Sequence, residues 1–475
     1  MLTLTDLFCG AGGSSTGALA VPGIEVRMAS NHWDLAVETH NTNHPTADHL
    51  CADLSQIDPR YFPRTDILWA SPECTNHSIA KGKKHQNSQP DLFGEVLPDQ
   101  AAERSRATMW DVPRFAEVHR YEAVIVENVV DAWNWEPFQA WLMAMDCLGY
   151  QSQCVFLNSM HAQAFGQGAP QSRDRMYVVF WRNGNAAPDL GRLNRPDALC
   201  LDCGPVKALQ WWKRAAPNWG RYRAQYLYRC PNVKCRNRVV EPIFRPASEI
   251  IDWEIRGQRI GDRAKPLADK TLARIQAGLD KYWGPFITEH RHEYRVRDIN
   301  SPLQTVAASG NHFGLAVPVE GRQGKQALPI SAPARTMTTR NETALAFIAE
   351  LRGGGSKHRP ISEPLATVTA SGNHHGLVTT YYGNGSTTPT TEALSTCTTV
   401  ERHALLTKDI PAVDISDVLF RMLEPSEIKR AMDFPVDYTI LGNRREQVRM
   451  SGNAVTPPAA RDLIGVVAES LGVPA

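Results

Sequence analysis

The sequence predicts an α/β fold in which strands and helices alternate around an open sheet. Three observations support this prediction. An apolar strand at 2–8 runs directly into a glycine-rich turn and then into a helical segment. A second apolar run, at 66–70, is ended by Pro72, because proline cannot donate a hydrogen bond to a strand ladder. A third run, at 123–126, has the character of a fully buried strand and is followed by a helix and another strand.

Composition sets limits on the function. The 475 residues suffice for two or three domains with an ample core. Because 51 Lys and Arg face 50 Asp and Glu, net charge predicts no partner, and any nucleic-acid surface must be a local patch. No apolar run is long enough to span a bilayer, and the N-terminus lacks a basic leader segment, so we expect a cytoplasmic protein. Its ten cysteines then suit metal ligation, nucleophilic catalysis and core packing rather than disulfides.

The first candidate site is the turn Cys9-Gly10-Ala11-Gly12-Gly13, and we expect Ser14 or Ser15 to cap the helix after it. A strand, a glycine turn and a helix let the backbone approach a nucleotide-like ligand. The spacing is not the dinucleotide fingerprint, no lysine follows for a phosphate-binding loop, and glycines also serve plain tight turns. The next two strands end near Asn31 and Asp53, which are candidate contacts for ribose hydroxyls and an exocyclic amine, or ordinary cap and turn residues.

Cys74 is the candidate nucleophile, since it follows the strand at 66–70 in the loop Ser71-Pro72-Glu73-Cys74-Thr75. An isolated cysteine is more often a small buried hydrophobe, but polar neighbours and the proline argue against burial here. The polar stretch at 81–90 has no apolar periodicity, which predicts a loop that either clamps a substrate or only keeps the surface soluble.

Glu127 is the candidate acid, because it stands at the tip of the strand at 123–126, after a helix expected near 100–119. A carboxylate placed there is costly unless it has a partner or a chemical task, so the alternative is a salt-bridged core acid. A helix at 135–148 and a strand at 151–157 follow. The run Gln171-Ser172-Arg173-Asp174-Arg175 then introduces the last strand of this half, at 176–181.

These motifs resemble, in order and spacing, those of the DNA (cytosine-5)-methyltransferases. The matching segments are Asp6-Leu7-Phe8-Cys9-Gly10-Ala11-Gly12-Gly13, Pro72-Glu73-Cys74, Glu127-Asn128-Val129, Gln171-Ser172-Arg173-Asp174-Arg175, 421–427 with Phe434-Pro435, and 447–455. The resemblance covers roughly 1–182 and 416–470. One departure matters: the family's loop usually reads Pro-Cys-Gln, whereas Glu73 and Thr75 flank the cysteine here. An acid beside a thiol disfavours the thiolate unless its side chain points away or is paired.

The resemblance implies a doubly wound, mostly parallel sheet of the class I S-adenosylmethionine-dependent methyltransferases, whose last helix returns to the first strand. It divides the chain into a catalytic part at 1–182, an inserted recognition part at 183–415 and a return to the catalytic domain at 416–475. By motif position it also implies a set of contacts to S-adenosyl-L-methionine. These are Phe8, Gly10, Ala11, Gly12, Gly13, Asn31, Asp53, Ser71, Pro72, Asn453 and Ala454.

The same resemblance implies a mechanism in which Cys74 adds to C6 of a cytosine flipped out of double-stranded DNA, while Glu127 protonates or hydrogen-bonds N3. Arg173 and Arg175 would hold the base while the methyl group reaches C5. Two alternatives stay open: a DNA-binding protein on this scaffold with impaired catalysis, and a methyltransferase that acts on RNA or uses a modified donor. We expect a monomer, without a membrane partner, that can act beside a cognate restriction nuclease.

The insert begins with two close cysteine pairs, Cys200 with Cys203 and Cys230 with Cys235, in a basic module expected at 183–262. Such pairs suit tetrahedral ligation of a structural Zn²⁺, and a reduced, metal-free set is the alternative. Between 200 and 240, nine basic residues face one acid and are interleaved with six Trp and Tyr residues. This composition fits phosphate contacts and base stacking, or a small module whose aromatics form its core.

The second part of the insert, expected at 263–415, contains a repeat. Units with central threonines at 305, 336, 367 and 396 recur at a nearly fixed period, which indicates one supersecondary unit used several times. Repeated polar loops would present similar donors and acceptors along a DNA groove, or they are repeated turn chemistry only. We expect Arg221 and Arg223 to supply sequence-independent DNA affinity, and Asn311 and Asn373 to affect site choice.

Overall fold

The computed structural model describes residues 1–72, 100–269, 271–273, 275–276 and 415–474, together with seven short strands between 287 and 379. Cys74 and its neighbour Glu73 lie outside these residues, as do the repeat threonines. Among the described residues, no helix combines the length and the apolar character that crossing a lipid bilayer requires.

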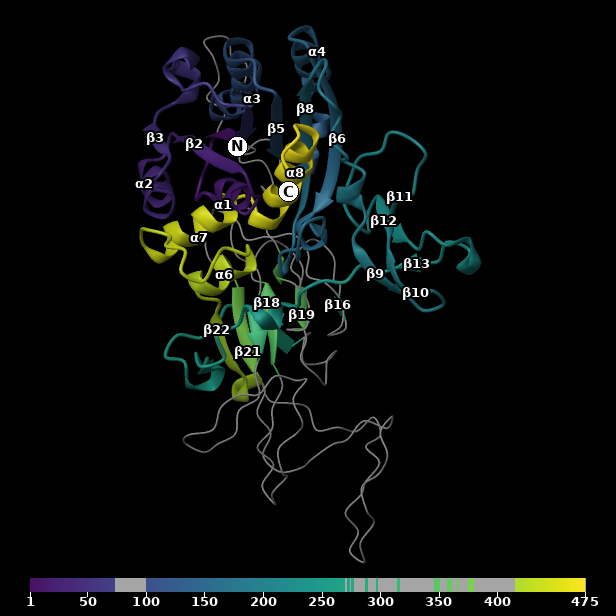
Figure 1. The fold of residues 1–475 in the computed structure, drawn as a ribbon. Coiled ribbons are helices and arrows are strands. Elements are labelled where there is room, and N and C mark those ends of the chain that lie inside the picture. Colours follow the sequence, from purple (N-terminus) through teal and green to yellow (C-terminus); the bar gives the residue numbers. More distant parts are fainter. Residues whose placement is uncertain are drawn as a thin grey trace, which may run out of the picture.

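A seven-stranded sheet forms the centre of the catalytic part (Figure 1), in the order β3-β2-β1-β4-β5-β8-β6. Its strands are β1 (Leu2–Leu7), β2 (Ile24–Asn31), β3 (Asp48–Cys51), β4 (Ile67–Ala70), β5 (Ala123–Asn128), β6 (Tyr150–Asn158) and β8 (Asp174–Arg182). Only β8 runs antiparallel to its neighbours in this sheet. This topology confirms the doubly wound, mostly parallel sheet, and the strand order changes direction between β1 and β4, where such sheets bind ligands.

Helices cover both faces of the sheet. Neighbouring residues of each strand point to opposite sides, so both faces carry apolar side chains that the helices bury. Ile67 and Trp69 pack with α1 (Gly13–Leu19) and α8 (Pro457–Ser470) on one face. Leu68 and Ala70 pack on the other face with α3 (Gln100–His119) and α4 (Phe138–Cys147). The expected return of the last helix is present, since α8 packs against α1 directly after β1 (Figure 1).

The remaining C-terminal elements are α6 (Pro425–Ala431) and α7 (Arg444–Asn453), while α2 (Asp34–Asn43) follows β2. Strand β22 (Leu419–Met422), within the expected return at 416–475, pairs with β21 (His375–Thr379) and β14 (Gln258–Arg259), so its hydrogen bonds join it to the sheet of the insert.

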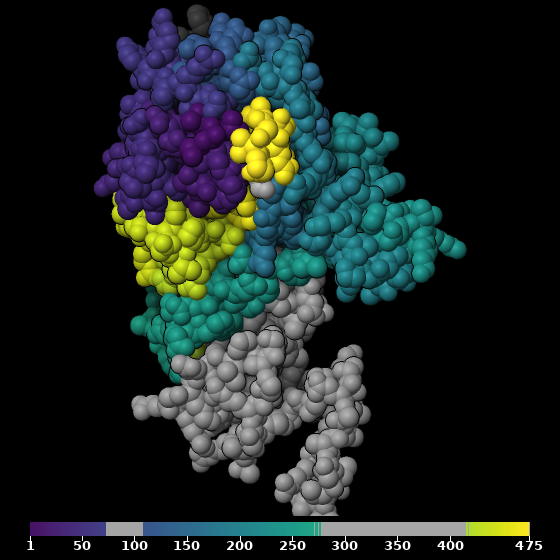
Figure 2. Space-filling model, viewed as in Figure 1, coloured from purple at the N-terminus to yellow at the C-terminus, as the bar shows by residue number. Residues whose placement is uncertain are grey.

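The first part of the insert is a small β module that projects beyond β6 (Figures 1 and 2). Strands β9 (Asp197–Cys200) and β10 (Gly204–Lys207) form a hairpin. Strands β11 (Leu209–Trp212), β12 (Tyr226–Arg229) and β13 (Val239–Val240) form an antiparallel sheet. We call residues 197–241 the cysteine module.

The second part forms a sheet in the order β14-β22-β21-β18-β19-β15-β16, with β17 (Gly314–Ala316) paired to β21. Its other strands are β15 (Ile287–Thr288), β16 (Val296–Arg297), β18 (Ala346–Glu350) and β19 (Lys357–Pro360). Strand β20 (Leu365–Ala366) lies apart from it and pairs with β7 (Gln171–Ser172) of the catalytic part. The expected β character of the repeat region is thus visible in its described strands.

Candidate active site

The sequence-predicted residues gather at one edge of the sheet, where β1, β2, β4 and β5 end and β8 begins. This edge carries the glycine turn, Asn31, the Ser71-Pro72 pair, Glu127 and Arg175. The amide of Asn128 donates to the carbonyl of Pro72 at 3.5 Å, which ties the end of β5 to the segment that leads into the Cys74 loop. The edge therefore places the start of that loop beside Glu127.

Glu127 and Arg175 form a buried ion pair across β5 and β8. The Arg175 Nε lies 2.8 Å from Glu127 Oε1, and each side chain is only 10% exposed. Arg175 also donates from Nη1 to the carbonyl of Asp174 at 2.9 Å. Since each charge offsets the desolvation of the other, the pair holds a carboxylate and a guanidinium in fixed orientation at the sheet edge.

Arg173 points elsewhere, although only one residue separates it from Arg175. Its guanidinium donates to the carbonyl of Gly452 at 3.1 Å and to that of Ala454 at 3.0 Å. The side chain is almost fully buried. These bonds give Arg173 the role of fastening the end of α7 to the start of β8, which differs from the base-holding role that the resemblance implies. They also bring Ala454 and the exposed Asn453 to the site edge.

The glycine turn has two sides with different tasks. Phe8 and Gly10 adopt left-handed backbone conformations, at φ 61° and 53°, and a Cβ added at Gly10 would meet nothing nearer than 4.0 Å. A Cβ at Gly12 would instead lie 2.4 Å from the Tyr438 hydroxyl, and one at Gly13 would lie 1.9 Å from the Val455 carbonyl oxygen. Among the predicted ligand contacts, Gly10 thus faces open space within the described residues, Phe8 packs partly against the core, and Gly12 and Gly13 face other parts of the chain.

Ala11 belongs to the packed side of the turn as well. It is fully buried, and its carbonyl accepts a hydrogen bond from the Tyr438 hydroxyl at 2.5 Å. Tyr438 therefore anchors the turn from the C-terminal segment, 427 residues further along the chain. No local sequence pattern indicates this contact, because it depends on how the two ends of the chain meet.

Asp6 supports the glycine turn through hydrogen bonds with the first residues of α1. The hydroxyls of Ser14 and Ser15 both donate to Asp6 Oδ2 at 2.6 Å, and the Ser15 hydroxyl lies 2.9 Å from His40 Nε2. The expected serine cap is wrong: Gly12 is the N-cap of α1, and the two serines are committed to the buried carboxylate. Burial raises the pKa of Asp6 to about 6, while the two serine hydroxyls partly oppose that shift.

Asn31 and Asp53 stand at the ends of β2 and β3, as expected. Asn31 is largely buried, and its Oδ1 accepts a hydrogen bond from the Trp33 amide at 3.0 Å. The exposed Asp53 carboxylate caps a short 3₁₀ helix (Leu54–Gln56) by accepting from Ser55. That hydrogen bond lowers the pKa of Asp53, so the carboxylate stays ionised and able to accept from a ligand.

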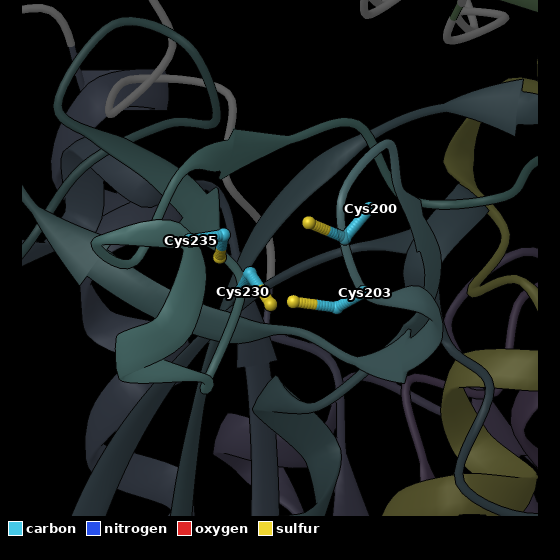
Figure 3. Close-up of side chains that lie close together, drawn as sticks. All are labelled: Cys200, Cys203, Cys230 and Cys235. Carbon is cyan, nitrogen blue, oxygen red and sulfur yellow. The ribbon is translucent and has the colours of Figure 1, made fainter.

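The four cysteines of the insert converge (Figure 3). Cys200 and Cys203 come from the β9–β10 turn, and Cys230 and Cys235 come from the segment after β12. Their sulfur atoms all lie within 4.8 Å of one another. Zinc–sulfur bonds of about 2.3 Å place the sulfurs of a tetrahedral site about 3.8 Å apart, so a small inward movement would satisfy that geometry.

The cysteine module is attached directly to the site edge. Arg221 pairs with Asp131, four residues after Glu127, through a 2.5 Å contact between Nη2 and Oδ2. The backbone amide of Tyr222 donates to Asp174 Oδ1 at 3.0 Å, between Arg173 and Arg175. Asp131 and Asp174 were not identified as anchors from the sequence; the available signal was that Asp174 lies within the motif at 171–175 and Asp131 lies two residues after Val129.

The DNA role expected for Arg221 and Arg223 does not match their surroundings. Arg221 is engaged by Asp131, and Arg223 lies 2.8 Å from Glu241. Both guanidiniums are therefore neutralised by acids of the chain itself. Asn311 and Asn373 lie outside the described residues. One repeat unit does reach the site, because Leu365–Ala366 pairs in parallel with Gln171–Ser172, next to Arg173.

The chain is similar to known proteins. A family model described as C-5 cytosine-specific DNA methylase matches residues 2–197 and 272–469, more than half of the chain. The Type II methyltransferase M.HhaI of Haemophilus parahaemolyticus is 29% identical over 187 residues, which are 38% of this chain and 50% of that protein. The Type II methyltransferase M.SsoII of Shigella sonnei is 26% identical over 178 residues, 37% and 41% of the two chains. The matched region spans about half the length of these curated relatives.

Two solved structures are similar over nearly the whole chain. A DNMT2 mutant from Spodoptera frugiperda is 12% identical, with 98% of this chain and 99% of that chain covered and a TM-score of 0.48. A putative DNA modification methyltransferase encoded within an E. coli prophage is 14% identical, with 99% and 100% covered and a TM-score of 0.46.

Proposed function

Because the chain belongs to the C-5 cytosine-specific DNA methylase family, we propose that it transfers a methyl group from S-adenosyl-L-methionine to C5 of a flipped-out cytosine in double-stranded DNA. The observation that carries this proposal is the buried Glu127–Arg175 ion pair at the sheet edge. The strand next to it, β4, leads through Pro72 into the loop of Cys74. An acid and a cation thus border the place where a base would sit, and Cys74 follows Pro72 by two residues in the sequence.

The roles of the residues follow from the chemistry of cytosine. C5 is a weak nucleophile, and addition of the Cys74 thiolate to C6 turns the ring into an enamine that is reactive at C5. Glu127 stabilises this addition by protonating or hydrogen-bonding N3, and Arg175 holds the carboxylate in place. C5 would then take the methyl group as its bond to the sulfonium sulfur breaks. Loss of the C5 proton to solvent and expulsion of the Cys74 thiolate from C6 would restore the aromatic ring. Arg173 contributes by fastening residues 452–454 to the site edge.

The cofactor would supply an electrophilic methyl group on a sulfonium. The chain fits such a ligand at the open side of the glycine turn, where Gly10 leaves space for close backbone approach and Phe8 has a left-handed backbone. Asn31 and Asp53 would contact its polar groups from the ends of β2 and β3. Ala11, Gly12 and Gly13 hold the turn against the C-terminal segment, so their part is to shape the site.

The test is bisulfite sequencing of DNA from cells that produce the protein, combined with trapping on DNA that carries 5-fluorocytosine at the mapped site. We expect methylated cytosines in one sequence context and a covalent complex that survives a denaturing gel. Wild-type protein that binds DNA but forms no trapped species would refute the mechanism and favour the impaired scaffold, for which Glu73 beside Cys74 is the motive. Methylation of RNA in place of DNA would refute the substrate.

We further propose that Cys200, Cys203, Cys230 and Cys235 hold one structural Zn²⁺. Purified protein should contain about one zinc per chain, as a four-ligand site requires. Cys203→Ser should lose the metal and the near-ultraviolet circular dichroism of the tyrosine-rich module, whereas Cys147→Ser, an exposed cysteine outside the cluster, should retain both. Metal-free protein with an unchanged melting profile would show that the cluster needs no metal.

We propose one extension, that the enzyme protects DNA against a cognate nuclease, which the Type II names of the relatives support. We also propose that it acts in the cytoplasm as a monomer. Plasmid recovered from producing cells should resist a nuclease that cuts the mapped site when it is unmodified. Cleavage at the unmodified rate would contradict this role and leave the methylation itself untouched.

A further inference from the structure

We propose that the outer face of the β11–β12–β13 sheet binds the sugar-phosphate backbone of DNA. The outer face consists of Leu209, Trp211, Leu227, Arg229 and Val239. The inference rests on the proposed function, since it assigns to the cysteine module a part in holding the same DNA. It replaces Arg221 and Arg223 as the expected source of DNA affinity with a surface that the structure leaves open.

Strand register defines this face. Trp211 pairs with Leu227, and Leu209 pairs with Arg229, so these four side chains point to one side of the sheet. The intervening residues point to the other side, where Tyr226 and Tyr228 are fully buried and Tyr228 makes an edge contact with His161. The sheet thus has one face that is part of the core and one that is not.

The inner face is fixed to the catalytic part. The Gln210 amide donates to the Phe156 carbonyl at 2.9 Å, and the rings of Trp212 and Phe156 are 5.7 Å apart. Together with the Arg221–Asp131 pair, these contacts seat the module on β6 and on the segment after β5. The outer face therefore has a set position relative to the site edge and points away from the body of the catalytic part.

The outer face is apolar, aromatic and cationic at once. Trp211 is 53% exposed and Val239 is 43% exposed. Exposed apolar side chains that lie together on one face are typical of an interaction site. The guanidinium carbon of Arg229 lies 5.1 Å from the centre of the Trp211 ring. An arginine held against an aromatic ring keeps its charge and loses little freedom when it meets an anion, which suits contact with phosphate.

The charge of the cysteine module favours DNA over a protein as the partner that binds the outer face. Of the nine basic residues between 200 and 240, four are paired with carboxylates of the chain: Lys207, Arg221, Arg223 and Arg238. Five have no carboxylate partner among the described residues: Lys213, Arg214, Arg229, Lys234 and Arg236. Only one acid, Asp202, lies in the same stretch, and Arg238 neutralises it.

These five cations lie at the two ends of the sheet. Lys213 and Arg214 follow β11 at one end, while Lys234 and Arg236 follow β12 at the other end, beside Arg229. Lys213 and Arg229 donate to backbone carbonyls, which leaves their positive charges without a carboxylate. Four-residue strands at about 3.3 Å per residue give the face a length of about 13 Å. One strand of duplex DNA presents about four phosphates over that length, which is comparable with the number of cations that lack a carboxylate partner among the described residues.

The test compares DNA binding by whole-chain variants over a range of salt concentrations, with a long duplex that contains the mapped site. Lys234→Ala combined with Arg236→Ala should weaken binding to all sequences alike and reduce the slope of log K against log salt by about two, since each phosphate contact contributes close to one. Trp211→Ala should weaken binding several-fold. The matched control is Lys207→Ala, because Lys207 is an exposed cation of the same module that already pairs with Asp197.

Zinc content and melting temperature, equal to those of the wild type, establish that each variant is folded. Folded variants with the wild-type affinity and salt slope would overturn the proposal. Dissociation of a wild-type dimer by Trp211→Ala in sedimentation would overturn it as well, by assigning the face to a second copy of the chain. Failure of the proposed function is distinct, because the wild type would then bind DNA without methylating it.

Discussion

Replacing glycines of the turn by alanine should separate packing from ligand binding. In Gly13→Ala, the new Cβ would lie 1.9 Å from the Val455 carbonyl oxygen and 2.9 Å from its carbon. Real Cβ atoms stay at least 3.0 Å from such atoms, so α1 and the start of α8 must move apart by more than 1 Å. Backbone cannot yield as a flexible side chain would. We expect a loss of about 3 kcal/mol in the free energy of unfolding, at the upper end for overpacked cores.

Gly10→Ala has the opposite profile. Its Cβ meets only the Phe8 carbonyl oxygen at 4.0 Å, so the cost is limited to the left-handed backbone conformation at φ 53°. That conformation costs a residue with a Cβ about 1 kcal/mol. The methyl group would nevertheless occupy the open side of the turn, and we expect binding of S-adenosylmethionine to fall at least tenfold. Gly184→Ala is the matched control, because Gly184 also has a positive φ and open space but lies in a remote turn.

The assays are urea unfolding followed by circular dichroism and calorimetric titration with the cofactor. We expect Gly13→Ala to be less stable than Gly10→Ala and Gly184→Ala. Of these two more stable variants, only Gly10→Ala should bind the cofactor poorly. Equal stability of Gly13→Ala and the wild type would refute the packing argument. Normal cofactor affinity in Gly10→Ala would refute the placement of the ligand.

Three further predictions concern the thiol, a buried acid and the anchor of the cysteine module. Cys74→Ser should abolish methyl transfer and covalent trapping while DNA binding persists, measured on the same oligonucleotide; residual trapping would contradict the assignment. Folding raises the pKa of Asp6 to about 6. Its contribution to the free energy of unfolding is therefore complete below about pH 4 and is lost as pH rises to about 6. Asp6→Asn should therefore gain stability relative to the wild type over that interval, by about 3 kcal/mol in unfolding experiments, and a constant difference would contradict the assignment. Arg221→Ala should lower kcat with DNA affinity unchanged, Arg221→Lys should restore part of it through Asp131, and a change confined to DNA affinity would contradict this positioning role.

Much of the catalytic fold was predictable because it is encoded locally. The buried strand predicted at 66–70 follows from an apolar run and a terminating proline, and the structure has it at Ile67–Ala70; the helix expected near 100–119 is present as well. Glu127 was identifiable because a carboxylate at the end of so apolar a strand needs a partner, and Arg175 is that partner.

The errors share one physical cause, which is that a local pattern does not reveal where a side chain points. Ser14 and Ser15 are good caps by residue type, but Asp6 lies within reach and takes both hydroxyls. Arg173 and Arg175 are indistinguishable in sequence, whereas one pairs with an acid and the other with carbonyls 279 and 281 residues away. Strand β22 likewise opens a motif of the catalytic part, and the sequence does not show that its hydrogen bonds go to the insert.

The fastening of Arg173 to residues 452 and 454 has a consequence for synthesis in the cell. A ribosome makes the glycine turn, Glu127 and Arg175 early, but the carbonyls that Arg173 needs and the Val455 backbone that packs on Gly13 come nearly three hundred residues after Arg175. A nascent chain therefore holds its chemical groups without the parts that set them in place. We expect DNA near a translating ribosome to be modified by finished molecules, and prematurely terminated products to be inert.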